Sequence, residues 1–241
     1  MSAEFEELDW SRTPIGELTL RRRLDPVSGR YVFEVKLGDE FLMSSLFTVA
    51  EIALAQIALA RLPGGTLDVA VGGLGLGYTA QRVLEDSRVR ELVVVELLQP
   101  VISWHRQRLL PAGQALTTDP RCRFIQGDFF KMSHGSGFDP QYASREFDAV
   151  LLDIDHSPKH LLADESAGFY GVAETRRLAS HLAEGGVYAL WSNDPPDQGY
   201  LDILAQVFVD VSAEVVRFPN PYQGRDAANT VYVATKARSS G

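Results

Sequence analysis

From residue 66 onward, short apolar segments alternate with segments of helical pattern, and this alternation limits the fold more than any other feature of the chain. The segments that read as buried strands are residues 67–71, 92–95, 122–125, 149–152 and 187–191. Nearly continuous apolar strands joined by helices are typical of a parallel sheet covered on both faces. Two further strand candidates, 211–218 and 230–235, have no obvious helix between them, which predicts a final antiparallel hairpin. We therefore expect an α/β fold: a doubly wound, mostly parallel, seven-stranded sheet with an antiparallel last strand.

The residues before this pattern predict a smaller β-unit. Residues 17–21 and 31–35 are β-rich and are separated by residues typical of a turn. A helical pattern over residues 46–61 then leads into the first strand of the sheet. We therefore expect two units, a small N-terminal β-hairpin module over residues 1–45 and the α/β domain over residues 46–241.

Composition excludes several classes of protein. The chain has 241 residues and a formal net charge of -9, and an acidic surface repels nucleic acid and anionic membranes. Cys122 is the one cysteine, so no disulfide can form within the chain, which fits a reducing compartment. No apolar run reaches the roughly 18 residues that a membrane span needs, and the acidic N-terminus does not resemble a secretory signal. We expect a cytoplasmic protein that binds neither nucleic acid nor membrane.

A glycine-rich turn follows the first strand of the predicted sheet and contains Gly72, Gly73, Gly75 and Gly77. Glycines allow positive φ and close approach of a ligand to the backbone, and the next helix begins with free N–H groups. A dinucleotide-binding fingerprint would need a third glycine at position 78, which is Tyr78. The observed spacing is the form that holds the amino-acid part of S-adenosylmethionine-type ligands. A tight turn that binds no ligand is the alternative.

Acidic residues end the second and third strands. Glu96 can accept the ribose hydroxyl hydrogen bonds of an adenosyl group, because ligands of open α/β sheets bind at the carboxyl edge of the strands. Asp128 can accept from the adenine amino group, while Phe129 or a nearby apolar residue covers the ring. Helix capping or a plain turn is the alternative for each acid. Together with the glycine turn, these residues predict an adenosyl site.

The fourth strand ends in a second acidic cluster of Asp153, Asp155 and His156. Carboxylates attract an ammonium group and accept the proton that an amine must lose before it reacts, so these residues are the catalytic candidates. A capping role in a loop is the alternative. His156 and His160 are four residues apart, but Pro158 lies between them, and we expect no metal site.

Asp194 and Asp197 follow the fifth strand and should lie on the same edge of the sheet as Asp153. They are candidates for binding the positive charge of an amine substrate. A proline-rich loop that caps the next helix is the alternative.

The chain resembles the spermidine synthase (polyamine aminopropyltransferase) family over about residues 17–236. The matching segments are residues 71–77, 94–96, 127–130, 147–153 and 169–170. The resemblance implies a class I methyltransferase-type Rossmann-like fold and a role in polyamine biosynthesis. The implied reaction is transfer of an aminopropyl group from decarboxylated S-adenosylmethionine to a small-molecule amine. It further implies a homodimer in which Glu96 holds ribose, Asp128 holds adenine and Asp153 is the catalytic acid/base.

The chain departs from the family at three places. Gly75 stands where the family has an aspartate that holds the amine of the donor, and His156 displaces or replaces the second acid after strand four. Residues 41–47 are largely apolar where the family has glutamine, tyrosine and histidine. Two alternatives therefore stay open. One is a methyltransferase that uses S-adenosylmethionine itself, which Gly75 favours, and the other is a non-catalytic adenosyl-nucleoside-binding protein.

Overall fold

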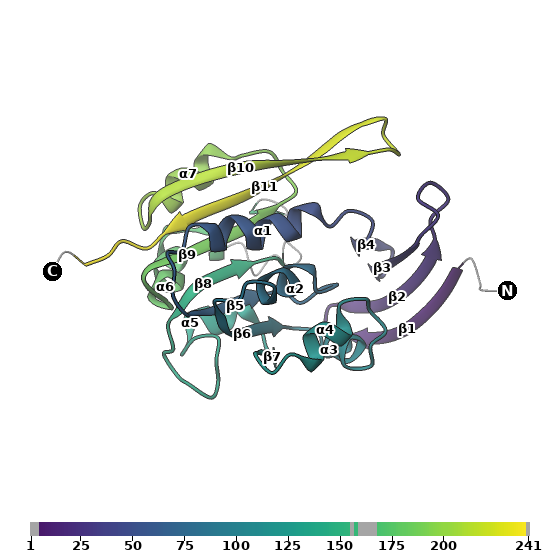
Figure 1. Ribbon diagram of the computed structural model, residues 1–241, viewed down its shortest axis with the longest axis horizontal. Helices are drawn as coiled ribbons and strands as arrows, with labels where there is room; N and C mark the ends of the chain where they lie inside the picture. Colours follow the sequence, from purple (N-terminus) through teal and green to yellow (C-terminus); the bar gives the residue numbers. More distant parts are fainter. Residues whose placement is uncertain (1–4, 155–156, 159–167, 240–241) are drawn as a thin grey trace.

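The computed structural model describes residues 5–154, 157–158 and 168–239 and contains two β-sheets (Figure 1). The first is a four-stranded antiparallel sheet in the order β1-β2-β3-β4. Its strands are β1 (Phe5–Thr13), β2 (Gly16–Leu24), β3 (Tyr31–Leu37) and β4 (Glu40–Ser44). The N-terminal module therefore has two more strands than the predicted hairpin. No residue of β1 or β4 is fully buried, so neither strand has the apolar alternation that would reveal it.

The second sheet has seven strands in the order β10-β11-β9-β8-β5-β6-β7. Its strands are β5 (Leu67–Gly72), β6 (Val89–Glu96), β7 (Cys122–Gln126), β8 (Phe147–Leu152), β9 (Leu182–Ser192), β10 (Val209–Asn220) and β11 (Arg225–Thr235). Strand β11 lies between β9 and β10 and is antiparallel to both, while the other pairings are parallel. The predicted doubly wound sheet with an antiparallel last strand is confirmed.

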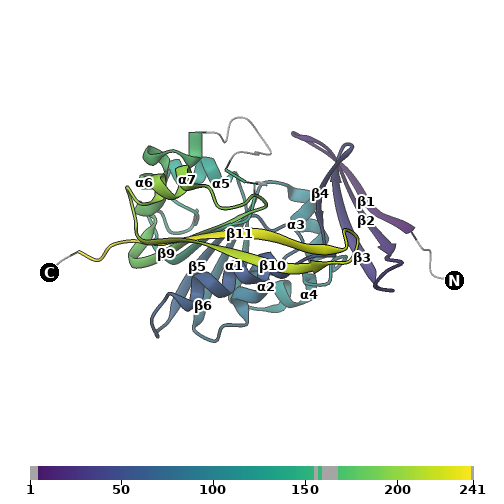
Figure 2. The same ribbon diagram turned by 90° about the horizontal axis from the view of Figure 1, so that it is seen from above.

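Helices cover both faces of this sheet (Figure 2). They are α1 (Val49–Ala60), α2 (Tyr78–Leu84), α3 (Gln99–Arg106), α4 (Gly113–Thr118), α5 (Phe129–His134), α6 (Val172–Ser180) and α7 (Gln198–Leu204). Helices α1 to α4 contribute to one apolar core and α5 to α7 to the other, which places the sheet between them. Within the described part of the chain, every helix is too short or too polar to cross a membrane.

Strands β10 and β11 extend beyond the sheet as a two-stranded hairpin arm, which we define as residues 216–229 (Figures 1 and 2). Strand β11 pairs with β9 only from Thr230 onward, so the arm is held by its own pairing. At its tip, the Tyr222 hydroxyl donates a hydrogen bond to Asp25, a fully buried carboxylate of the N-terminal module. The ring of Phe47 lies 5.4 Å from that of Phe218 on the arm. The arm therefore connects the two sheets.

Replacing Tyr222 by Phe should loosen this connection. Tyr222→Phe removes the hydrogen bond to Asp25 and leaves the ring in place, so we expect a loss of about 1 kcal/mol in the free energy of unfolding. Urea denaturation at neutral pH measures it. Tyr142→Phe is the matched control, because Tyr142 is 61% exposed on the surface. Equal stability of the two variants would contradict the role of the Tyr222 contact.

Candidate active site

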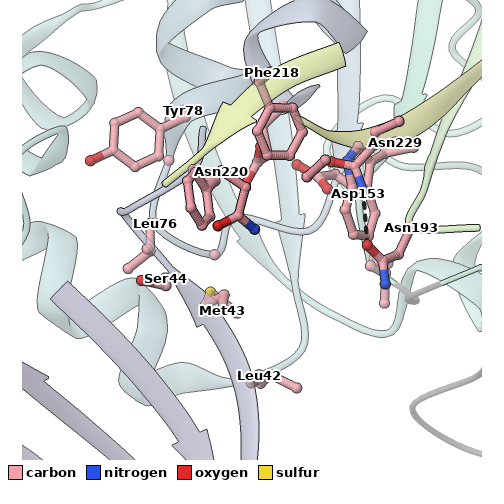
Figure 3. A pocket seen from close by; sticks show the side chains of 18 of the residues that line it. Leu42, Met43, Ser44, Leu76, Tyr78, Asp153, Asn193, Phe218, Asn220 and Asn229 are labelled. Carbon is pink, nitrogen blue, oxygen red and sulfur yellow. Dashed lines mark hydrogen bonds between the residues drawn. The ribbon is translucent and has the colours of Figure 1, made fainter. Parts of the chain in front are cut away.

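A cavity of about 370 Å³ lies where the carboxyl edge of the seven-stranded sheet, strand β4 and the hairpin arm meet (Figure 3). The glycine turn lines one side through residues 74–77. Leu42, Met43 and Ser44 of β4 line another, and Phe218 and Asn229 belong to the arm. Both sheets therefore contribute to its wall, and its size is within the range of small-molecule sites.

The glycine turn is fixed against the end of β8 by close backbone packing. The Asp153 N–H donates to the Gly72 carbonyl over 2.8 Å. A Cβ atom on Gly73 would lie 2.1 Å from the Asp153 carbonyl oxygen, and one on Gly72 would lie 2.5 Å from the ring of Phe129. Gly73 also has a φ of +92°. Only glycine fits these two positions, and the packing sets the place of Asp153 relative to the turn.

Gly75 faces the N-terminal module. Its φ is +47°, and a Cβ atom there would lie 3.2 Å from the Met43 sulfur. The Gly75 carbonyl also lies 2.9 Å from Nε2 of the buried His105. The Met43 side chain therefore lies close to the space that a side chain at position 75 would enter.

Glu96 lies at the carboxyl end of β6, as predicted, and is 8% exposed. Its carboxylate accepts the N–H groups of Leu74 at 3.0 Å and Leu98 at 2.8 Å, so it holds the glycine turn against β6. Burial raises the pKa of Glu96, and the backbone N–H groups oppose that shift. Beside it, Leu97 is 48% exposed and offers an apolar surface to a ligand.

Asp128 lies at the end of β7 and caps α5, where its Oδ1 accepts the Lys131 N–H at 3.1 Å. The ring of Phe129 is 2% exposed and stacks on Phe138 with centroids 4.4 Å apart. Phe129 therefore belongs to the apolar core, and its ring packs against Gly72. The Phe129 ring is therefore not accessible to cover an adenine ring, whereas the Leu97 side chain, which follows β6, is 48% exposed.

Asp153 lies in the cavity together with a second acid, Glu51 of α1. The Thr79 hydroxyl donates to Asp153 Oδ2 over 2.6 Å and lies 3.2 Å from the Glu51 carbonyl oxygen. Burial raises the pKa of Asp153 to about 6. Burial, with the nearby charge of Asp153, raises the pKa of Glu51 to about 8. At pH 7 this carboxylate pair therefore holds one proton and one negative charge between its members.

Sequence reasoning missed Glu51. Glu51 is the one charged residue in the twelve-residue helix α1, but it stands in the first turn, three residues after the N-cap Thr48, where a glutamate is common for reasons of helix stability. Its position in the sequence therefore carries no sign of a role in the cavity. Among the described residues that line the cavity, Glu51 and Asp153 carry the charges, and none is Lys, Arg or His.

Amide side chains also line the cavity. Asn193 follows β9, Asn229 belongs to β11, and the Asn229 Nδ2 donates to the Asn193 Oδ1 over 2.9 Å. Asn220 and Gln223 line the cavity from the outer part of the arm. Asn193 and Asn229 come from strands that pair only in the folded sheet, so their spacing in the sequence carries no sign that they meet.

The structure separates Asp194 and Asp197 from this cavity. The Asp194 carboxylate accepts the Ser157 hydroxyl at 2.6 Å, and Asp197 accepts the Gly199 N–H at 2.7 Å and caps α7. Both line a different hollow, of about 350 Å³, beside Pro195. Their role in substrate binding stays a prediction without support from the cavity that contains Asp153.

The predicted residues Asp155, His156 and His160 lie outside the described residues. Within residues 5–154, 157–158 and 168–239, no group of three or more His, Cys, Asp or Glu side chains is arranged to hold a metal ion.

Comparison with solved structures identifies the fold. The chain superposes with a TM-score of 0.71 and 18% identity on spermidine synthase from Thermotoga maritima, covering 96% of this chain and 73% of that one. It superposes with a TM-score of 0.71 and 17% identity on spermidine synthase in complex with the transition-state analogue AdoDATO, covering 96% and 72%. A probable spermidine synthase from Corynebacterium glutamicum gives a TM-score of 0.64 and 16% identity, covering 95% and 79%. The chain therefore has a spermidine-synthase-like fold with a methyltransferase-type Rossmann core.

Comparison of sequences adds no further assignment. No family model matches the chain, and no curated protein matches it. The substrate and reaction must therefore be argued from the site itself.

Glu51 should make the stability of the protein depend on pH. Its native pKa of about 8 lies above that of an exposed glutamate, so the native state binds more protons than the unfolded state between about pH 4.5 and 8. Stability is therefore lost as the pH rises through this window. Glu51→Gln removes the effect, and we expect the melting temperature of the variant, relative to the parent, to increase from pH 5 to about pH 8 and to level off by pH 9.

Thermal unfolding across that range measures the difference. Glu85→Gln is the control, because the Glu85 side chain is 58% exposed. A difference between Glu51→Gln and the parent that stays constant with pH would contradict the assignment of Glu51 as a buried acid with a raised pKa.

Proposed function

We propose that the chain is an aminopropyltransferase that moves an aminopropyl group from decarboxylated S-adenosylmethionine to a small-molecule amine. The observation that supports this most is the charge of the cavity. Two carboxylates, Glu51 and Asp153, face the space beside the glycine turn, and no described lining residue is basic. A decarboxylated donor brings an ammonium group to these acids, whereas S-adenosylmethionine also brings a carboxylate that they would repel.

The adenosyl part of such a donor would lie against strand ends that adjoin the cavity but do not line it. The Glu96 carboxylate is held at the strand end, the exposed Leu97 lies beside it, and Asp128 ends the next strand. We propose that Glu96 binds the ribose, Asp128 the adenine amino group, and Leu97 one face of the adenine ring. The donor itself supplies a sulfonium leaving group.

Glu51 compensates for the missing acid of the glycine turn. In the family that the chain resembles, an aspartate at position 75 holds the donor amine, but here that position is a glycine with the Met43 sulfur close by. Glu51 lines the same cavity and is coupled electrostatically to Asp153. We propose that Glu51 binds the ammonium group of the donor, which leaves Asp153 for the acceptor.

Asp153 then acts as the base. Its carboxylate is oriented by the Thr79 hydroxyl, and a pKa of about 6 leaves it ionised at pH 7 but more basic than an exposed aspartate. Asp153 binds the acceptor as an ammonium ion and takes its proton. The free nitrogen attacks the carbon next to sulfur, so a C–N bond forms while the C–S bond breaks. The bonding electrons stay on sulfur, and methylthioadenosine leaves.

Calorimetric titration with decarboxylated S-adenosylmethionine, S-adenosylmethionine and methylthioadenosine tests the donor. We expect the decarboxylated form to bind at least tenfold more tightly than S-adenosylmethionine. We also expect its binding at pH 7 to release a proton, because an ammonium group favours the ionised form of Glu51, whose free pKa is about 8. Affinity should therefore rise with pH from 6 to 8.

The proton release is measured by repeating the titration in two buffers of different ionisation enthalpy. Glu51→Gln should abolish both the proton release and the difference in affinity between decarboxylated S-adenosylmethionine and S-adenosylmethionine. Tighter binding of S-adenosylmethionine would instead support methyl transfer. Failure of all three compounds to bind would overturn the adenosyl site.

Replacing Asp153 by Asn should separate chemistry from donor binding. Asp153→Asn keeps the shape of the side chain but removes the base, so we expect turnover to fall by about 100-fold or more, while donor affinity changes by only a few-fold. Release of methylthioadenosine measures turnover, with the exposed Glu85→Gln variant as the control. Unchanged turnover in Asp153→Asn would exclude Asp153 as the base.

A further inference from the structure

The cavity has two chemically different ends. Asp153 and Glu51 lie at the sheet end, next to the glycine turn. Asn220 and Gln223 lie at the arm end. We propose that the acceptor is a monoamine with an uncharged oxygen group at its other end, such as an amino alcohol, and not a diamine. This inference rests on the proposed aminopropyl transfer.

Strand register separates the two ends. Asn229 pairs with Val216 across the arm, just beyond the point where β11 leaves β9. Asn220 lies four residues further along β10, which at about 3.3 Å per residue is roughly 13 Å toward the tip. The cavity therefore runs outward along the arm from the carboxylates, and Asn220 points into it from the arm (Figure 3).

The amides at the arm end present donors to the cavity. The Asn220 Oδ1 accepts the backbone N–H groups of Tyr222 at 3.1 Å and Gln223 at 3.3 Å. The Gln223 Oε1 accepts from Arg225 Nε at 3.3 Å. Because the Asn220 oxygen is engaged by two backbone donors, its NH₂ group is the part of this amide left to bind a ligand. An NH₂ group binds a hydroxyl or carbonyl oxygen and disfavours an ammonium ion, which has only donors.

Further in, the Asn229 Nδ2 donates to the Asn193 Oδ1, so this pair retains both an NH₂ group and an amide oxygen that can bind a ligand. The rings of Phe47 and Phe218 line the cavity together with Trp191 and suit an alkyl chain between the two polar ends.

Counting charges leads to the same conclusion. The donor brings one ammonium group, which we have assigned to Glu51, and the acceptor nitrogen brings another to Asp153. These two acids are the charged groups among the described lining residues. A second ammonium on the acceptor would find no carboxylate among the described lining residues at the arm end. A single ammonium with a neutral oxygen has a partner at each end.

Matched acceptors test the proposal. The parent protein is supplied with decarboxylated S-adenosylmethionine and either 4-aminobutan-1-ol or 1,4-diaminobutane, and then with the five- and six-carbon pairs, while methylthioadenosine is measured. We expect kcat/KM to be at least tenfold higher for the amino alcohol in the best pair. Equal or higher values for the diamines, or for 5-aminopentanoate, would overturn the proposal.

A single substitution should reverse the preference. Asn220→Asp keeps the acceptor oxygen for the Tyr222 and Gln223 N–H groups, so the turn is preserved, and it places a carboxylate at the arm end. We expect the ratio of amino alcohol to diamine kcat/KM to fall at least tenfold. Gln114→Glu, an exposed change on α4 with the same added charge, should leave the ratio unchanged. An unchanged ratio in Asn220→Asp would also overturn the proposal.

Binding of the same amines to the donor-free protein, measured by calorimetry, separates this proposal from the proposed function. If no amine yields methylthioadenosine but the amino alcohol still binds more tightly than the diamine, aminopropyl transfer fails and the assignment of the acceptor end stands. If methylthioadenosine forms and the diamines are the preferred acceptors, the proposed aminopropyl transfer stands and the assignment of the acceptor end fails.

Discussion

The contact between the ends of β5 and β8 determines the rest of the site. Gly72 and Gly73 lie so close to Asp153 and Phe129 that no side chain fits at either glycine, and the Asp153 N–H closes the contact on the Gly72 carbonyl. Since the turn and the acid share this contact, neither can move without the other. A positively charged donor on the turn and an amine on Asp153 would therefore meet with a geometry set by backbone packing, which is the rigid support that positioning of two reactants requires.

The charges of Glu51 and Asp153 then favour cationic ligands at this edge. A carboxylate on an apolar helix and a carboxylate at a strand end are both partly removed from water, and each makes ionisation of the other harder. At neutral pH the pair therefore carries less than its full negative charge, and a bound cation would favour ionisation of both acids. Position 75 of the glycine turn has no side chain, and the Met43 sulfur of the N-terminal module lies close to it.

The sheet and the acids at its strand ends could be predicted from the sequence for a physical reason. Strands buried on both faces show as apolar runs, and the carboxyl ends of parallel strands share one edge, so Glu96, Asp128 and Asp153 could be placed near one another without a structure. Strands β1 and β4 were not predicted because none of their residues is fully buried. Asp194 was expected beside Asp153 because it follows the neighbouring strand, but its side chain turns to Ser157 instead. The direction of one side chain after a strand end depends on its hydrogen-bond partners, which local pattern does not reveal.

The hairpin arm belongs to β10 and β11, the last two strands along the sequence, and it contacts the N-terminal module. Tyr222 reaches Asp25, almost two hundred positions earlier, and residues of both segments enclose one cavity. During synthesis on the ribosome, the N-terminal sheet and strands β5 to β9 can form while the arm is still missing. The enclosed cavity requires residues up to Asn229, so the growing chain has no closed binding site before the arm has been synthesised. Ligand binding therefore reports on a chain in which the arm is in place.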